Sequence, residues 1–400
     1  MKTEPILRQP ASLVLPEIAR RTQRVAPFLA MDVLAAAAAK ERRGDRVVHM
    51  EVGQPSAPAP RAAREAAKAA LEAGRIGYTE ALGIAPLRER IARHYAEAYG
   101  VAVAPERVVV TTGSSAGFVL AFLSLFDPGQ RVAITAPGYP AYRNILEALG
   151  LEPVTIPLTK ADGWIMTAGA VERAHAERPL HGVLAMSPAN PSGTMIGRDA
   201  LADLGDTCRR LGLWFVSDEI YHGLTYDAPA ATALASDEDA VVINSFSKYY
   251  CMTGWRIGWI VVPPRLVRPL ERLAQNLYIS PPSLSQVAAV AAFEAADELE
   301  AVKAAYARNR ALLLNELPRL GIGDMHPVDG AFYVYADLAR YTNDAIAFCQ
   351  RMLDEAGVAA TPGVDFDPLE GAHYVRFSFA GSEEDCREAV ARLRGWLPRV

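Results

Sequence analysis

The sequence predicts an α/β protein: a larger part built on a mainly parallel sheet, followed by a smaller α+β part. Between about residues 60 and 260, helix-forming stretches alternate with short β-branched runs. These runs are apolar throughout, without polar alternation, which is typical of strands buried on both faces of a parallel sheet. After Pro281 and Pro282 the pattern changes to a long helical stretch and then to strands of alternating polarity, which indicates a second domain.

Length and charge limit the class of protein. With 400 residues, 51% of them hydrophobic, the chain is long enough to bury more than one core. Its formal net charge of -5 leaves no basic surplus for a nucleic acid, so we expect no such partner. Nowhere do about 18 uncharged apolar residues follow one another, and the N-terminus lacks a signal-peptide pattern. We therefore expect no membrane association and a cytoplasmic protein.

The cysteines and histidines show neither a disulfide nor a metal-binding pattern. Four cysteines lie far apart and form no C-x-x-C pair, which argues against a zinc ribbon or a disulfide framework: Cys208, Cys251, Cys349 and Cys386. The seven histidines are scattered, without the spacing of ligands on a helix. The sequence thus predicts no metal site and a reducing compartment.

The secondary structure can be predicted in order from the N-terminus. Residues 31–43, MDVLAAAAAKERR, are mainly strong helix formers, and the apolar run after them ends at Gly53 and Pro55. Two further helices are expected in RAAREAAKAALEAG and APLRERIARHYAEAYG. The expected buried strands are RVVVTT, RVAIT, HGVLAM, LWFVS, AVVINS and IGWIVV. We then expect a helical region over 284–317 and two half-exposed strands, GAFYVYADL and HYVRFSFA.

A hydroxyl-flanked lysine directly after a buried strand is the strongest functional signal. The segment SFSKYYCMTGWRIGW, residues 245–259, contains Lys248, with Arg256 eight residues later. Lysine is rarely buried unless it is paired or reactive, and desolvation lowers its pKa toward the range in which the amine attacks a carbonyl. Alone, Lys248 would be interpreted as a surface lysine. The strand before it and the hydroxyls and arginine around it favour a reactive amine.

This segment resembles the cofactor-lysine signature of class I and II aminotransferases, enzymes that use pyridoxal 5'-phosphate (PLP). The resemblance implies that Lys248 holds PLP as a Schiff base and that Ser245 and Arg256 bind its phosphate. A guanidinium fork suits a phosphate dianion, and a small hydroxyl adds a donor without bulk. The resemblance also implies the architecture of fold type I PLP-dependent transferases, with a seven-stranded, mainly parallel sheet in the large domain and a small α+β domain from both termini.

A strand, a small-residue turn and an amphipathic helix follow one another in VVVTTGSSAGFVLAFLSLF, from residue 108. The backbone N–H groups of Ser114 and Ser115 would then lie at a helix N-terminus, which binds anions. Such turns are common and by themselves indicate a plain helix cap. Because the family has its phosphate cup after this same strand, the resemblance assigns both serines to the cofactor phosphate.

Asp218 ends the apolar strand in WFVSDEIYHGLTYD, at the edge where open α/β sheets bind ligands. By itself it is equally well explained as a helix N-cap. The resemblance implies that Asp218 bonds the protonated pyridine nitrogen of PLP, which keeps the ring cationic. It also implies that Tyr221 hydrogen-bonds the phenolic oxygen of the cofactor.

Two turn segments add further cofactor contacts. MSPANPSGTM resembles the Asn-Pro-Thr/Ser-Gly turn of the family, in which Asn190 would donate to the phenolic oxygen and border the substrate. TAPGYPAYRN contains Tyr139, which would stack on the pyridine face. By composition alone the first is simply a good turn, and a tyrosine such as Tyr139 is more often just packed.

Two residues are expected to bind the substrate. Arg376 lies within an otherwise apolar strand, which costs free energy unless a carboxylate meets it, so we predict a bidentate clamp on the α-carboxylate of the amino acid. A salt bridge to an internal acid is the alternative. Gly53 in EVGQP resembles an early glycine of the family, whose missing side chain lets substrate approach the backbone.

The segment GYTEALGIAPLRERI resembles one that crosses to the partner subunit in this family. Tyr78 would then contact the partner's cofactor phosphate, which implies a homodimer with shared active sites. The resemblance extends from about residue 50 to the C-terminus. It divides the chain into a segment 1–52 that joins the small domain, a large PLP-binding domain 53–284 and a C-terminal small domain 285–400.

The predicted activity transfers an amino group between an L-amino acid and a 2-oxo acid, by a ping-pong mechanism through PLP and pyridoxamine phosphate. Lys248 is the general base and acid. The segment NLYISPPSLSQ, expected to border the pocket, supplies Tyr278 but no arginine for a second carboxylate, which favours neutral or aromatic amino acids. Cys251, in the loop after Lys248, predicts sensitivity to thiol reagents.

Two alternatives stay open. A PLP-dependent lyase or decarboxylase on the same fold would use nearly the same residues and differ only in its products. A non-catalytic regulator with an aminotransferase-like domain would need a DNA-binding module, and the roughly 50 residues before Gly53 show no basic helix-turn-helix pattern.

Overall fold

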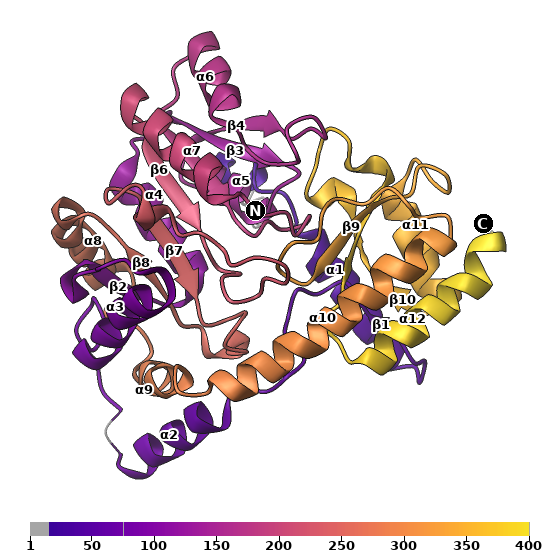
Figure 1. Ribbon diagram of the computed structural model, residues 1–400, viewed down its shortest axis with the longest axis horizontal. Helices are drawn as coiled ribbons and strands as arrows, with labels where there is room; N and C mark the ends of the chain where they lie inside the picture. Colours follow the sequence, from indigo (N-terminus) through magenta and orange to yellow (C-terminus); the bar gives the residue numbers. More distant parts are fainter. Residues whose placement is uncertain (1–15, 75, 400) are drawn as a thin grey trace, which may run out of the picture.

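The computed structural model describes residues 16–74 and 76–399 and forms three sheets in that part of the chain (Figure 1). The strands are β1 Val48–His49, β2 Val108–Thr111, β3 Arg131–Ala136, β4 Glu152–Pro157, β5 Gly182–Met186, β6 Trp214–Asp218, β7 Val241–Ser245, β8 Gly258–Val261, β9 Tyr333–Asp337, β10 Val358–Ala359, β11 Thr361–Pro362 and β12 Tyr374–Ser378. The largest sheet has seven strands in the order β2-β8-β7-β6-β5-β3-β4. Only β8 runs antiparallel to its neighbours, so the prediction of a mainly parallel sheet is confirmed.

All six strand runs expected from the sequence are present in this sheet, and the residues alone missed β4. This strand lies at the edge and pairs only with β3. Pro153 and Pro157 interrupt its pattern, because proline cannot donate to a ladder and is confined to edges and strand ends. An edge position, which only the folded sheet defines, is what accommodates both prolines.

The helices are α1 Leu29–Glu41, α2 Arg61–Glu72, α3 Ala85–Tyr99, α4 Gly113–Leu125, α5 Pro140–Ala148, α6 Ala168–Glu177, α7 Arg198–Leu211, α8 Pro264–Leu277, α9 Ser283–Ala292, α10 Ala296–Arg319, α11 Ala345–Arg351 and α12 Glu383–Trp396. Neighbouring strand residues point to opposite faces of the large sheet: Val242 packs with α3, α7 and α9, whereas Val241 and Ile243 pack with α4, α5 and α8. Burial on both faces explains why the strands are apolar throughout.

The smaller part of the molecule joins both ends of the chain. β1 pairs in parallel with β10, and a three-stranded antiparallel sheet has the order β11-β12-β9. In Figure 1 the indigo α1 and β1 lie among the orange and yellow C-terminal elements. Val48 and Met50 belong to the same hydrophobic core as Phe377 and Trp396. The limits proposed above at residues 53 and 285 stay a prediction, and residues 1–15 of the first segment lie outside the described residues.

Two local expectations differ from the structure. β9 and β12 were expected to be half-exposed, yet their residues are nearly all buried because neighbouring elements cover both faces. The helical region expected over 284–317 is two helices, α9 and α10, separated by residues 293–295. Within residues 16–74 and 76–399, no helix combines the length and apolar character needed to cross a bilayer.

Candidate active site

A cavity of about 500 Å³ lies where the large sheet meets the smaller part of the molecule. Asp218 is the last residue of β6, Lys248 follows β7, Asn190 follows β5, and Tyr139 follows β3. These positions share the carboxyl edge of the parallel strands, which is where such sheets bind ligands. Ten of the twelve predicted site residues line the cavity: Gly53, Ser114, Ser115, Tyr139, Asn190, Asp218, Tyr221, Lys248, Arg256 and Arg376.

Lys248 lies half-buried in the turn after β7, with its amine inside the cavity. Its Nζ donates to the carbonyl oxygen of Gly53 at 2.6 Å. Burial lowers the pKa of Lys248 to about 8; the positive charges of Arg376 and Arg256 act in the same direction, and Asp218 opposes them. A lysine with this pKa carries a substantial fraction of neutral, nucleophilic amine near neutral pH.

Asp218 is 2% exposed and both of its carboxylate oxygens are bonded. Oδ1 accepts from the backbone N–H of Ile220 at 3.0 Å, and Oδ2 accepts from the hydroxyl of Tyr142. Burial raises the pKa of Asp218 to about 6, while these two hydrogen bonds and the charge of Lys248 favour its ionised form. The carboxylate is therefore held in one orientation and can ionise near neutral pH beside a cationic partner.

An anion cup in the wall of the cavity is formed by the N-terminus of α4 and Arg256. Ser114 and Ser115 form the first turn of α4, whose N-cap residue Thr112 makes no side-chain capping bond. The first N–H groups of a helix lack partners within it and attract anions. The guanidinium of Arg256 packs on the backbone here: a Cβ on Gly113 would lie 2.4 Å from its Nη2. Only a residue without a side chain leaves room for the arginine.

Arg376 lies in the middle of β12 and is 2% exposed. Nη1 donates to Oδ1 of Asn190 at 2.9 Å, and Nη2 donates to the carbonyl oxygen of Glu51 at 2.5 Å and to Oγ1 of Thr361 at 3.2 Å. No acid pairs with it among these contacts, and its Nε has no hydrogen-bond partner among the described residues. The internal salt bridge considered above is absent from these contacts, so the guanidinium keeps donors for an external carboxylate.

Aromatic residues complete the walls. The hydroxyls of Tyr221 and Tyr333 lie 2.7 Å apart in the buried interior, and burial raises the pKa of Tyr221 well above its usual range. Tyr139 meets Tyr142 edge to face at 5.3 Å between ring centroids, and burial raises its pKa to about 12. Both Tyr139 and Tyr221 are therefore neutral hydrogen-bond donors across the physiological pH range.

Two predicted residues do not line the cavity. Ser245 is 1% exposed, and its Oγ lies 3.0 Å from the carbonyl oxygen of Ile257, which accepts its proton, and 2.9 Å from Oγ of Ser247. Ser247, two residues later, does line it. Tyr78 is 84% exposed. Tyr278, expected beside the pocket, is 36% exposed and also lies outside the lining.

Sequence reasoning missed three residues that the structure brings to the site. Tyr333 contacts Tyr221, and a Cβ on Gly53 would lie only 1.8 Å from its hydroxyl oxygen. Tyr142 bonds Asp218, and Ser247 lines the cavity beside Lys248. The motif SFSK offered Ser247 as a second hydroxyl next to the lysine. Nothing local in the sequence distinguishes Tyr333 or Tyr142 from core tyrosines.

The donors and acceptors of the cavity fit PLP in kind and in order. The α4 N-terminus and Arg256 suit a phosphate, the amine of Lys248 suits an aldehyde, and the buried carboxylate of Asp218 suits a protonated ring nitrogen. The most specific of these observations is that the Arg256 guanidinium lies against Gly113, where a Cβ would otherwise be. Among the described residues, no cluster of three or more His, Cys, Asp or Glu side chains is arranged to hold a metal ion.

Comparison with known proteins points to a single family. The family model described as aminotransferase class I and II matches residues 45–393. The chain is 50% identical to the valine–pyruvate aminotransferase of Mycobacterium tuberculosis over 378 residues, which cover 94% of this chain and 97% of that protein.

Solved structures give the same result. A crystal structure of an aminotransferase from Mycobacterium tuberculosis superposes with a TM-score of 0.94 at 49% identity, covering 96% of this chain and all of that one. An aspartate aminotransferase from Thermus thermophilus with maleate superposes with a TM-score of 0.90 at 30% identity, covering 95% and 100% of the two chains.

Proposed function

This chain belongs to the class I and II aminotransferase family, and on that premise we propose that it uses PLP to move the amino group of a neutral or aromatic L-amino acid to a 2-oxo acid in two half-reactions. The observation that carries the proposal is the convergence of Lys248, Asp218 and Arg376 on one cavity beside an anion cup. An amine, an acid and a guanidinium in this arrangement are what the two half-reactions require.

When bound, PLP supplies the aldehyde carbon that receives the amino group and a cationic ring that accepts the electron pair released at the substrate Cα. Ser114, Ser115 and Arg256 would hold its phosphate, Asp218 its ring nitrogen, and Tyr221 and Asn190 its phenolic oxygen. Tyr139 would cover the ring face. Ser245 would act on the phosphate only if its hydroxyl turned away from Ile257. Ser247, which lines the cavity, is therefore the better placed hydroxyl.

Lys248 is the proposed proton carrier. Its amine lies in the cavity and burial lowers its pKa to about 8, so Nζ takes the proton from the substrate Cα as a general base. The resulting ammonium would then return the proton to the carbon on the far side of the amino nitrogen, two atoms from Cα. Arg376 holds the α-carboxylate of the amino acid, and afterwards that of the oxo acid, so both substrates present Cα to the same amine.

The cavity wall favours a neutral side chain. The cations that line it are Lys248, Arg256 and Arg376, each of which already has a role. The remaining wall includes apolar side chains from the N-terminal segment, α4, β5 and the turn after β6: Phe28, Met31, Phe118, Met186 and Ile220. A dicarboxylic substrate would leave its second carboxylate without a partner here. The name of the Mycobacterium tuberculosis relative, a valine–pyruvate aminotransferase, agrees with a neutral substrate.

A homodimer is part of the proposal. Tyr78 is 84% exposed, and Ile76, two positions before it, is exposed too. The hydroxyl of Ser283 donates to the carbonyl oxygen of Gly77, and the exposed Leu277 and Ile279 lie a few positions before Ser283. Exposed apolar groups gathered in this way are typical of protein interfaces. Sedimentation of the purified protein should give twice the chain mass, and Tyr78→Phe should weaken PLP retention. A monomer with full activity would refute the shared site.

Transamination is tested with the purified, PLP-loaded protein. We would supply valine, alanine, phenylalanine and aspartate as donors, each with pyruvate and with 2-oxoglutarate, and identify products by mass spectrometry. The proposal expects a new amino acid from a neutral donor and much less from aspartate. Release of ammonia or CO₂ without a new amino acid would instead establish a lyase or decarboxylase, and exclusive use of aspartate would overturn the substrate class.

A further inference from the structure

The short segment from Val48 to Gly53 provides backbone acceptors for two cations of the active site. The carbonyl oxygen of Glu51 accepts from Nη2 of Arg376 at 2.5 Å and from Oγ1 of Thr361 at 2.8 Å. Two residues later, the carbonyl oxygen of Gly53 accepts from Nζ of Lys248 at 2.6 Å. A shift of this segment would therefore move the partners of both cations together.

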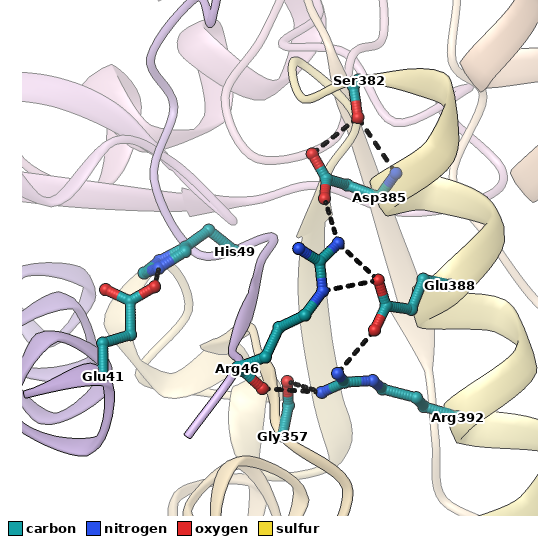
Figure 2. A network of polar contacts seen from close by, with 8 residues as sticks. All are labelled: Glu41, Arg46, His49, Gly357, Ser382, Asp385, Glu388 and Arg392. Atoms are coloured by element: carbon teal, nitrogen blue, oxygen red, sulfur yellow. Dashed lines mark hydrogen bonds and ion pairs between the residues drawn. The ribbon is translucent and has the colours of Figure 1, made fainter. Parts of the chain in front are cut away.

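The side chain of Glu51 is the buried partner of a half-buried ion pair. It is completely buried, and Oε1 lies 2.7 Å from Nδ1 of His49, while Oε2 has no partner among the described residues. The other ring nitrogen of His49, Nε2, lies 3.1 Å from Oε1 of Glu41 at the end of α1 (Figure 2). Because each ring nitrogen faces a carboxylate oxygen, both must carry a proton, so His49 is an imidazolium.

We propose, on the premise of the function above, that the His49–Glu51 ion pair is a positioning device for substrate binding: it holds the main chain of Glu51 against Arg376 and so determines how tightly the guanidinium binds a carboxylate. Neither side chain lines the cavity, whereas Val52 and Gly53 do. Both residues therefore act through Arg376 and are positioning residues, not catalytic ones.

An ion pair whose carboxylate is fully buried favours a positional role over a purely stabilising one. Such pairs contribute little net stability because desolvation offsets their attraction, but removing one partner is costly because the other stays buried and unpaired. An apolar side chain at Glu51 would fill the same space. It would not link Glu51 to His49, and through His49 to Glu41 of α1.

The pair should respond to pH in a defined direction. The hydrogen bond to Glu51 raises the pKa of His49 to about 9, and the charges of Glu51 and Glu41 support this shift against burial. Arg376 on β12 and Lys248 after β7 are positive charges that contact the same segment. Because the pKa is raised above the usual 6.5, the pair is complete below about pH 6.5 and is lost as the pH passes about 9. Carboxylate affinity should fall in that upper range.

Arg46, two residues before this segment, provides a matched control. Its guanidinium pairs with Glu388 of α12 at 2.6 Å and with Asp385 at 3.3 Å, and Arg392 joins the same network (Figure 2). Its side chain is 59% exposed, and none of its recorded contacts reaches Arg376. Arg46→Gln therefore removes an ion pair close to this segment and leaves the His49–Glu51 pair in place.

The test uses PLP-loaded Glu51→Gln, His49→Gln, the double variant and Arg46→Gln. We would measure the Kd of isobutyrate, an unreactive carboxylate, by calorimetry, and then KM and kcat for both substrates. We expect each single variant to raise the Kd of isobutyrate and both KM values about tenfold. The kcat should stay within about twofold of the original. The double variant should be no worse than either single one, since the two residues act as a pair. Arg46→Gln should leave every constant unchanged.

The pH profile separates positioning from general loosening. In the unmodified enzyme the Kd of isobutyrate should rise above about pH 9, and this rise should be absent in His49→Gln. The proposal is overturned if Glu51→Gln and His49→Gln bind isobutyrate within twofold of the original, if Arg46→Gln weakens it equally, or if His49→Gln keeps the alkaline rise. If Glu51→Gln does not fold, His49→Gln decides the matter, because the imidazole is 36% exposed.

Failure of the two proposals can be told apart. If the enzyme transaminates no amino acid but isobutyrate binding follows the pattern above, the proposed function fails and the positioning role stands. If transamination proceeds normally in Glu51→Gln and His49→Gln, with isobutyrate binding and KM unaltered, the function stands and the positioning role fails.

Discussion

The amine of Lys248 donates a 2.6 Å hydrogen bond to the carbonyl oxygen of Gly53, 195 positions earlier in the chain. This bond joins the turn after a strand of the large sheet to the N-terminal segment that completes the smaller part of the molecule. The amine therefore lies at the junction between the two parts, in a cavity that Asp218 and Arg376 also line.

Replacing the lysine should abolish the chemistry while the protein stays folded. Lys248→Ala removes both the proposed cofactor anchor and the proposed proton carrier, so we expect transamination to fall at least ~10³-fold, within the roughly 10²–10⁴ range for loss of a general base. The visible absorbance of bound PLP should disappear. Lys68→Ala, which removes an exposed lysine of α2, is the control and should be neutral. Unaltered absorbance and activity in Lys248→Ala would refute the assignment.

Adding a single methyl group at residue 53 should disturb a tyrosine pair. In Gly53→Ala the new Cβ would lie 1.8 Å from the hydroxyl oxygen of Tyr333, which must move away from Tyr221. We expect about 1–3 kcal/mol lower stability from overpacking and a tenfold or larger fall in kcat/KM. In the control Gly395→Ala, a Cβ on α12 meets nothing within 4 Å. Equal kinetics for the two variants would contradict the close approach.

The hydroxyl of Tyr142 should tune the acidity of Asp218. Burial raises the pKa of that carboxyl to about 6, and the bond from Tyr142 favours its ionised form. Tyr142→Phe should therefore raise the pKa further, moving the acid limb of the pH–rate profile upward by about 1–2 units, since a bond to a charged group contributes about 1.5–3 kcal/mol.

Tyr374→Phe is the control for this change, because Tyr374 stacks on Tyr335 away from the cavity. Its pH profile should match that of the unmodified enzyme. If the profile of Tyr142→Phe also coincides with the original, Tyr142 does not stabilise the charged carboxylate.

The native enzyme should resist thiol reagents, contrary to the expectation from the position of Cys251 in the sequence. Cys251 is 5% exposed, and burial raises the pKa of its thiol to about 11, so little thiolate exists near neutral pH. The other three cysteines are buried as well. Mass spectrometry after iodoacetamide treatment at pH 7.5 should find Cys251 unmodified in the native protein and modified in guanidinium. Rapid native alkylation with loss of activity would restore the original expectation.

Most of the fold could be predicted because its signals are local. The apolar runs of β2, β3, β5, β6, β7 and β8 are visible as such, since strands buried on both faces need no polar partner. β4 was not visible, because Pro153 and Pro157 fit a strand only at a sheet edge, and edges are defined by pairing. The burial of β9 and β12 likewise depends on elements that come from elsewhere in the chain.

The residues of the site likewise fall into those that the sequence could predict and those that it could not. Lys248, Asp218 and Ser114 each follow a recognisable strand, so their gathering at one sheet edge could be expected before any coordinates. Tyr142 and Tyr333 could not be identified, because a tyrosine that bonds a functional group reads like one that fills a core. The hydroxyl of Ser245 faces Ile257, and Ser247 takes the place at the cavity, a difference of two residues that depends on turn geometry.

The sequence by itself determined which chemical groups this protein has at the strand ends: an amine, a carboxylate, a guanidinium and a helix N-terminus. It could do so because each group belongs to a short motif whose local structure follows from neighbouring residues. Only the tertiary structure decided what those groups touch. Arg376 meets the carbonyl of Glu51 across 325 positions. That contact depends on two long-range pairings, β1 with β10 and β11 with β12, which no local pattern encodes.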